Sequence, residues 1–279
     1  MTTKKLQNQR LNVVLCQMTS TDVVADNVVQ ALSLLKHISE PANIDLISFP
    51  ENCLYLRLDE DEEVQGLTLD SDVFKPFCDY AKKHSVLIHL GSIPLRKNKK
   101  LYNSTVIIWD DGSLSSDYSK IHLFDVDVEG HKPVRESKTF SHGHEPAVIE
   151  YRGWKIGLGI CYDLRFPELF LHYSRHPVDL LLLPAAFLVP TGQAHWEVLL
   201  RARAIEAQAF VAAAAQWGEH KGEKKSTRKT YGHSMVIDPW GTKMVEVPSG
   251  MGIIEASLEK DLIDKVRKQI PMRNHRRLK

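Results

Sequence analysis

The sequence has no run of apolar residues long enough to cross a bilayer as a helix. Its first ten residues, MTTKKLQNQR, are polar and lack the apolar segment of a secretory signal peptide. Its 36 lysines and arginines nearly balance 35 aspartates and glutamates, so the formal net charge of +1 gives no overall attraction to nucleic acid or anionic membrane. These absences predict a cytoplasmic protein with neither nucleic acid nor membrane as a partner.

Cysteine is also scarce, and its spacing argues against a C-x-x-C redox site and against a zinc site. The four cysteines are Cys16, Cys53, Cys78 and Cys161, and no two of them form a C-x-x-C pair or a zinc-type spacing. Without an export signal, free thiols are the expected state. Three of the four lie in surroundings typical of small buried side chains, and the fourth, Cys161, needs separate treatment.

Strand-like and helix-like segments alternate along the chain, and no linker or change of composition divides it. The pattern predicts strands at 11–18, 45–51 and 154–163, and helices at 71–85 and 195–208. This alternation predicts a single α/β domain over residues 1–279, and the high number of strands indicates two stacked sheets flanked by helices.

The rest of the pattern predicts a long loop and a further pair of strands. Residues 118–150 are polar and irregular, which predicts a long loop, and long loops inside compact domains are often functional. GHSMVIDPWGT (232–242) and GIIEASL (252–258) are predicted to pair as two strands around the Pro-Trp-Gly turn.

Cys161 ends the apolar strand KIGLGIC, and a helix with Pro167 in its first turn follows. A thiol at such a turn lies where α/β sheets bind ligands, outside the carboxyl end of a strand. The helix N-terminus is expected to lower the pKa of the thiol and to supply N–H donors for an oxyanion. The alternative is a buried cysteine with only a packing role, and spacing places none of the thirteen histidines as its base.

Two further segments carry a single charged residue beside an apolar stretch. Glu51 follows Pro50 at the end of DLISFP, and Lys120 lies in YSKIHLFD. Taken singly, each is equally compatible with an exposed loop residue that has no function.

Together, these segments resemble the carbon–nitrogen hydrolase (nitrilase) superfamily. FPE with Glu51, SKIHLFD with Lys120 and GICYDLRFPE with Cys161 occur in the order of that family's three signatures, and the resemblance extends from the first strand to the closing HRR. It implies a four-layer α-β-β-α sandwich with two sheets packed face to face. It implies neither a metal nor an organic cofactor, and it implies a homodimer or a higher homo-oligomer.

The resemblance also implies a role for each residue of the three motifs. Glu51 is implied as the general base and Cys161 as the nucleophile. Lys120 and the backbone N–H of Tyr162 are implied to stabilise the oxyanion. An intact set of these residues argues against a catalytically idle binding or scaffold protein.

The family carries a second glutamate between the lysine and the cysteine. In this sequence Glu136, within RES of the polar segment, matches it, and Glu145 and Glu150 are nearby alternatives. The second glutamate would orient Lys120 or the incoming water, and a cation between two carboxylates limits their mutual repulsion.

Within the superfamily, the chain resembles the branch of deaminated-glutathione amidases. The segments that carry this likeness are TGQAHWEVLLRARAIEAQAFVAAAAQWGEH, YGHSMVIDPWGT and IPMRNHRR. The ω-amidases, which hydrolyse α-ketoglutaramate, share AHWE and much of the rest, and an N-carbamoyl hydrolase would use the same catalytic residues. The resemblance therefore implies a small-molecule amide of a 2-oxo acid as substrate, cleaved through a cysteine thioester.

Such substrates carry carboxylates, so the pocket needs a cation. Arg165, four residues after Cys161, can bind a carboxylate through two parallel hydrogen bonds. The alternative for Arg165 is a structural ion pair with Glu168 or Asp163.

Three more residues complete the predicted substrate site. Thr191, in the loop before the HWE helix, would add a hydroxyl, Phe187 would form an apolar wall, and Tyr162 would supply its N–H. The basic loop 221–229 is predicted to be solvent-exposed or to approach the mouth of the pocket and favour a di-acid substrate.

Overall fold

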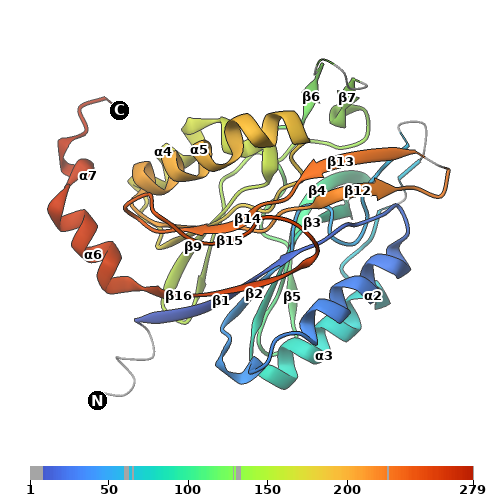
Figure 1. The fold of residues 1–279 in the computed structure, drawn as a ribbon, viewed down its shortest axis with the longest axis horizontal. Coiled ribbons are helices and arrows are strands. Elements are labelled where there is room, and N and C mark those ends of the chain that lie inside the picture. The colour runs from blue at the N-terminus through green and yellow to red at the C-terminus, as the bar shows by residue number, and fades with distance from the viewer. Residues whose placement is uncertain are drawn as a thin grey trace.

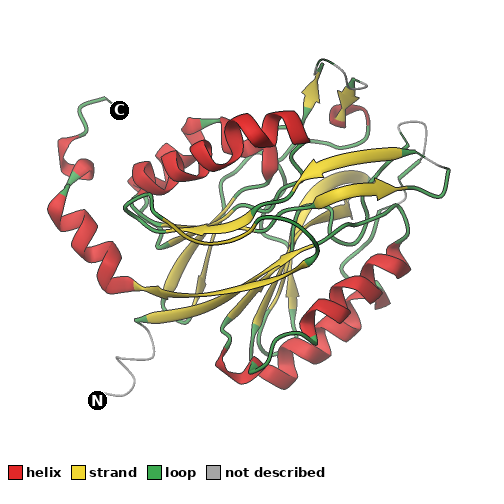
Figure 2. Ribbon diagram, in the orientation of Figure 1, coloured by secondary structure: helices red, strands yellow, loops and turns green. Residues whose placement is uncertain are grey.

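The computed structural model of the protein describes residues 9–59, 63–64, 66–127, 129, 133–224 and 226–278. Two sheets stack face to face, and a pair of helices covers the outer face of each (Figure 1; Figure 2). The covering helices are α2 (Val24–Leu35) and α3 (Lys75–His84) on one side, and α4 (Pro167–Arg175) and α5 (Val189–Ala207) on the other. The four-layer α-β-β-α sandwich predicted from the sequence is confirmed.

Each sheet has six strands. Sheet A has the order β16-β1-β2-β3-β4-β5, and sheet B has the order β15-β14-β11-β10-β9-β8. The strands of sheet A are β1 (Arg10–Gln17), β2 (Leu46–Ser48), β3 (Leu87–Lys97), β4 (Lys100–Ile108), β5 (Leu114–Ser115) and β16 (Gly252–Glu259). Those of sheet B are β8 (Val148–Tyr151), β9 (Trp154–Leu158), β10 (Leu180–Leu182), β11 (Phe210–Ala213), β14 (Ser234–Ile237) and β15 (Lys243–Val247). The three central strands of each sheet run parallel, which brings the carboxyl ends of β1, β2 and β3 to one edge and those of β9, β10 and β11 likewise.

Shorter elements lie around the sandwich. Two small antiparallel pairs join β6 (Asp125–Val126) to β7 (Val134–Arg135), and β12 (Trp217–Lys221) to β13 (Thr227–Tyr231). The short helices are η1 (Pro41–Asn43), η2 (Asp72–Phe74), η3 (Glu136–Lys138) and η4 (Cys161–Arg165). The chain ends in α6 (Lys260–Gln269) and α7 (Met272–His275), which lie at one side of the sandwich (Figure 1), and α6 buries Ile263 and Val266. In the described part of the chain, no helix combines the length and apolar composition that crossing a bilayer requires.

The apolar pattern of β1 shows how the layers are held together. Side chains along a strand alternate between its two faces. Leu11, Val13 and Leu15 pack into the cluster between the sheets, whereas Val14 and Cys16 pack under α2 and α3. All five are fully buried, which is why this strand reads as a nearly continuous apolar run.

Three local expectations differ from the structure. The strand at 252–258 does not pair with 232–242, because β14 pairs with β15 around the Pro-Trp-Gly turn and β16 crosses to β1 in sheet A. Helix α5 begins at Val189, six residues before the predicted start, because Pro190 suits a first helical turn. The predicted loop 118–150 contains β6, β7, η3 and β8.

Candidate active site

Cys161 lies at the start of η4, just beyond the carboxyl end of β9. Its backbone N–H donates to the carbonyl of Pro184 over 2.8 Å, and its φ of +47° is left-handed. For a residue other than glycine this conformation costs about 1–2 kcal/mol, and such strain is concentrated at functional turns. The turn presents the thiol to a pocket between the sheets while leaving the residue only 8% exposed.

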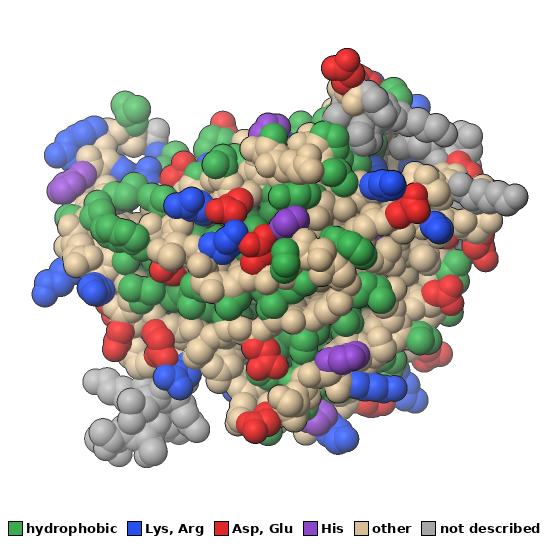
Figure 3. Space-filling model, in the orientation of Figure 1, with side chains coloured by type: hydrophobic (Ala, Val, Ile, Leu, Met, Phe, Trp, Pro, Cys, Tyr) green, Lys and Arg blue, Asp and Glu red, His purple; other side chains and the backbone are tan. Residues whose placement is uncertain are grey.

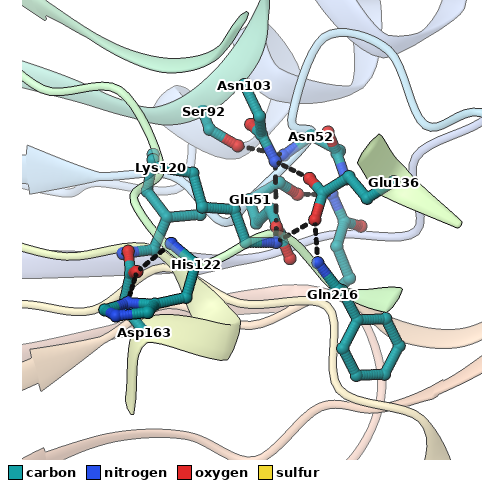
Figure 4. A network of polar contacts seen from close by, with 12 residues as sticks. Glu51, Asn52, Ser92, Asn103, Lys120, His122, Glu136, Asp163 and Gln216 are labelled. Carbon is teal, nitrogen blue, oxygen red and sulfur yellow. Dashed lines mark hydrogen bonds and ion pairs between the residues drawn. The ribbon is translucent and has the colours of Figure 1, made fainter. Parts of the chain in front are cut away.

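Asp163 holds this turn in place. One carboxylate oxygen accepts hydrogen bonds from the Tyr118 hydroxyl at 2.7 Å and from the Ile160 N–H at 2.9 Å. The other oxygen accepts the His122 N–H at 2.9 Å and lies 2.7 Å from His122 Nδ1 (Figure 4). Because Asp163 is fully buried and every contact is short, the backbone beyond Cys161 has little freedom to relax.

Glu51 lies in the turn that follows β2, and contacts from both sheets fix it. The N–H of Asn52, whose φ is +57°, donates to Ser92 Oγ over 3.1 Å. Gln216, in the segment that follows β11 of sheet B, donates its side-chain N–H to the backbone carbonyl of Glu51 over 2.9 Å. A Cβ on Gly91, at the bulge of β3, would lie 2.2 Å from a carbonyl oxygen of this turn, so only glycine permits the close approach.

Lys120 joins two carboxylates, the buried Glu51 and the largely buried Glu136, whose side chain is 11% exposed (Figure 4). Its Nζ lies 2.8 Å from Glu51 Oε1 and 2.8 Å from Glu136 Oε2. Of the three candidates for the second glutamate, the structure therefore places Glu136 beside the lysine, whereas Glu145 and Glu150 are exposed.

Asn103, on β4, completes this cluster, and the sequence analysis did not identify it. Its Nδ2 donates to Glu51 Oε1 over 3.1 Å and to Glu136 Oε1 over 2.8 Å, and its backbone carbonyl oxygen accepts the backbone N–H of Lys120 at 2.8 Å. The only sequence feature at this position is the glycosylation pattern Asn-Ser-Thr, which is buried in the strand. Asn103 was missed because its partners come from elements distant in the sequence.

The pKa of Cys161 differs from the expectation. Burial raises the pKa of the thiol well above its usual value, and the Glu51 carboxylate raises it further. The Lys120 ammonium and the Ala186 N–H offset this only in part. The prediction of a lowered pKa is wrong for the resting protein, because the thiol is buried against a carboxylate and η4 is a single short turn. The thiol therefore holds its proton until a base removes it.

Lys120 stays charged. Burial by itself would lower the pKa of its ammonium, but Glu136, Glu51 and Cys161 together hold that pKa well above its usual value. A cation shared by two carboxylates keeps the cluster near neutrality despite its burial. A thiol, a carboxylate base and a fixed ammonium together provide the groups that acyl transfer requires.

One pocket contains all four predicted catalytic residues. Its lining residues are Glu51, Asn52, Tyr55, Arg57, Pro94, Lys120, Phe124, Val134, Arg135, Glu136, Phe140, Cys161, Ala186 and Arg228. Among the residues that the structure describes, no three His, Cys, Asp or Glu side chains are grouped to hold a metal ion.

The structure gathers three of the four predicted substrate-binding residues beside this pocket, and none of the four lines it. The Arg165 guanidinium lies 5.1 Å from the ring centre of Phe187 and 5.9 Å from that of Tyr162. Its Nη1 is 3.0 Å from His195 Nδ1, and the described residues show no ion pair with either predicted acidic partner. The Thr191 hydroxyl donates over 3.2 Å to a carbonyl three residues earlier, inside the first turn of α5 rather than in a loop.

Replacing Asn103 with leucine should lower kcat about 100-fold and change KM little, because two buried carboxylates lose a donor that aligns them with Lys120. Replacing it with aspartate, which has the same shape, should lower kcat more, since a third carboxyl group would face the first two. Initial rates over a range of substrate concentrations, together with thermal unfolding of each variant, test this. A purely structural role predicts instead that the isosteric aspartate variant is the less affected.

Comparison with known proteins shows similarity over nearly the whole chain. The family profile described as carbon-nitrogen hydrolase matches residues 12–268. The deaminated glutathione amidase of Dictyostelium discoideum is 36% identical over 287 residues, covering 99% of this chain and 97% of that protein. The omega-amidase NIT2 of Mus musculus is 35% identical over 268 residues, covering 94% of each. The crystal structure of Saccharomyces cerevisiae Nit3, a member of branch 10 of the nitrilase superfamily, matches with a TM-score of 0.84 at 29% identity, covering 97% of each chain.

Proposed function

The chain belongs to the carbon–nitrogen hydrolase family and is an amide-hydrolysing enzyme, and we propose that its substrate is deaminated glutathione or a similar ω-amide of a 2-oxo acid. The observation that carries the proposal is the meeting of Glu51, Lys120 and Glu136 in one pocket with Cys161. The similarity to deaminated glutathione amidases over nearly the full length supports the choice of substrate.

The first step in this proposal activates the nucleophile. Since the raised pKa of Cys161 keeps its thiol protonated, a neighbouring base must act, and Glu51 is the carboxylate whose charge raises that pKa. Glu51 takes the proton as the Cys161 sulfur attacks the amide carbon and the carbonyl π electrons move to oxygen.

The resulting oxyanion needs donors that are already in position. Lys120, held by its two carboxylates, supplies one, and the N–H of Tyr162 at the first turn of η4 supplies the other. As the C–N bond breaks, Glu51 returns the proton to the departing amine, which leaves a thioester on Cys161.

Water completes the reaction. Glu51 removes a proton from water, the resulting hydroxyl attacks the thioester, and the sulfur departs and is protonated again. Glu136 orients Lys120 or this water. For deaminated glutathione the products are 2-oxoglutarate and cysteinylglycine, and for α-ketoglutaramate they are 2-oxoglutarate and ammonia.

Arg165 is our candidate for the carboxylate beside the oxo group. The contact with His195 and the Phe187 ring beneath hold its guanidinium in place, and Phe187 directly follows Ala186 of the pocket. A guanidinium fixed in this way binds a carboxylate with little loss of side-chain entropy. Thr191 is a weaker candidate, since its hydroxyl already has an acceptor within α5.

The second candidate function is that of an ω-amidase acting on α-ketoglutaramate, which the similarity to NIT2 of Mus musculus favours. The two are separated by kcat/KM for each substrate, measured as release of 2-oxoglutarate. We expect deaminated glutathione to be preferred at least about tenfold, which corresponds to about 1.4 kcal/mol of transition-state binding. A preference for α-ketoglutaramate of that size would reverse the assignment, and N-carbamoyl compounds complete the panel.

Three further properties stay predictions: a single domain over residues 1–279, assembly into a homodimer or larger homo-oligomer, and a cytoplasmic location. The helix after Cys161 and the C-terminal segment are the proposed subunit contacts.

A further inference from the structure

Three arginines line the pocket that contains the nucleophile, and we call them the arginine rim: Arg57, Arg135 and Arg228. With Lys120 they give the pocket four cationic side chains against the two carboxylates of Glu51 and Glu136. Both carboxylates are already engaged by Lys120 and Asn103, so neither is free to pair with the rim. The face of the protein drawn in Figure 3, in contrast, carries charges of both signs interspersed. The lining of the pocket therefore contains more positively than negatively charged side chains.

Two members of the rim already have partners. Arg57 donates to Thr139 Oγ1 and, over 3.0 Å, to the carbonyl of Asp59. Arg135 forms two hydrogen bonds of 2.8 Å to the carboxylate of Asp127 and two of 2.9 Å to backbone carbonyls. These two arginines shape the rim, but most of their donors are occupied.

Arg228 differs from both. Among the residues that the structure describes, its guanidinium has no hydrogen-bond or ion-pair partner. It is half-buried on β13 and lies opposite His220 of β12, on the face of the hairpin that also carries Thr230. His220 and Thr230 are buried, so this is the inward face. A half-buried cation that lines a catalytic pocket and has no partner among the described residues is suited to an anionic ligand.

The other cations of the basic loop 221–229 do not share this position. Lys221 and Lys229 point outward on the hairpin and pair with Glu219 at 3.7 and 3.8 Å, and Lys224 pairs with Asp59 at 3.9 Å. Lys225 lies outside the described residues. Because side chains alternate between the two faces of a β-strand, Arg228 lies on the face of β13 toward the pocket, whereas its neighbour Lys229 lies on the opposite face.

We propose that Arg228 binds a carboxylate on the leaving-group side of the substrate, so that the enzyme recognises amides whose departing amine is a short peptide or amino acid with a free carboxyl end. The proposal rests on the function proposed above. Arg165 lies outside the pocket lining and Arg228 lies within it, which gives two separate positions for carboxylates beside one nucleophile. Deaminated glutathione carries one carboxylate on each side of its scissile amide. An amide that releases ammonia has nothing on the leaving-group side that reaches Arg228.

The test compares deaminated glutathione with its C-terminal carboxamide, since the two differ only in the charge of the distal group. For the natural enzyme we expect kcat/KM for release of 2-oxoglutarate to be about 10- to 100-fold higher with the free carboxylate, mainly through KM. Arg228→Gln should bring this ratio close to one, and Arg228→Lys should retain part of it, because a lysine keeps the charge but not the forked geometry.

Lys229→Gln is the matched control, since it removes one positive charge from the neighbouring residue on the outward face. It should leave the ratio as in the natural enzyme. A natural-enzyme ratio near one, or an unchanged ratio in Arg228→Gln, overturns the proposal for Arg228 while the proposed function stands. If the natural enzyme releases 2-oxoglutarate from neither compound, the proposed function fails first, and the role of Arg228 fails with it.

Discussion

Replacing Cys161 with alanine should reduce kcat/KM for amide hydrolysis at least about 10⁴-fold, since loss of a nucleophile leaves only binding and oxyanion stabilisation. The fold should persist, because the substitution removes a single sulfur atom from a side chain that borders the pocket (Cys161 is 8% exposed) and alanine can adopt the left-handed backbone at φ +47°. Thermal unfolding recorded beside the kinetic assay checks that the protein remains folded.

Cys78 is the matched control. It lies on α3, is less buried than the other three thiols, and takes no part in the cluster around Lys120. Cys78→Ala should leave kcat/KM unchanged. Residual hydrolysis above about 1% in Cys161→Ala, with the other variant fully active, would show that a different group attacks the amide.

The raised pKa of Cys161 adds a readout that does not depend on knowing the substrate. Since the thiol is protonated at rest and Glu51 must remove its proton, Glu51→Gln should slow alkylation of Cys161 by iodoacetamide. Alkylation of Cys78 in the same sample serves as the internal reference, and Cys16 should react slowest because it is fully buried. A Cys161 alkylation rate that is the same in Glu51→Gln as in the natural protein would mean that Glu51 does not remove the thiol proton, contrary to its proposed role.

Much of the fold follows from local patterns in the sequence. The alternation of strand-like and helix-like segments and the high number of strands indicated stacked sheets flanked by helices, because periodicity is set by neighbouring residues. The partner of β16 was not predictable in this way. The strand follows β15 directly, yet it pairs with β1 at the other end of the chain. The pairing of strands that are distant in the sequence depends on tertiary packing, which local sequence patterns do not determine.

The site shows the same division. Glu51, Lys120 and Cys161 were identified because each carries a motif, and the structure brings all three to one pocket. Asn103 and Gln216 were not, since each acts through atoms of residues far away in the sequence. The predicted direction of the shift in the Cys161 pKa was also wrong, because the sequence reveals a helix terminus but not the burial of the thiol against a carboxylate.

Replacing Lys120 with methionine should lower kcat/KM about 10³-fold or more, since one preorganised oxyanion donor alone contributes about 10²–10³ in rate. It should also destabilise the protein by about 3–5 kcal/mol, because Glu51 would stay buried, and Glu136 largely buried, without their cation. Kinetics and denaturant unfolding of the same preparation measure the two effects separately.

The double variant Lys120→Met with Glu136→Gln separates catalysis from folding. Removing one of the two uncompensated carboxylates should recover much of the lost unfolding free energy, while the oxyanion still lacks its ammonium and the enzyme stays inactive. If stability and activity recover together, Lys120 acts only by holding the structure. Lys120→Arg should also be impaired, since a planar guanidinium cannot place its charge where the compact ammonium touches both carboxylates.

The pH dependence of that destabilisation has a defined sign. The folded-state pKa of Lys120 is raised above its unfolded value of 10.5, so its contribution to stability is fully present below that pH and is lost only as pH rises through the folded-state value. The difference in unfolding free energy between the natural protein and Lys120→Met should therefore be constant from about pH 6 to 9. A difference near zero over that range would mean that the two carboxylates do not depend on Lys120 for their burial, and the ammonium would then serve the oxyanion alone.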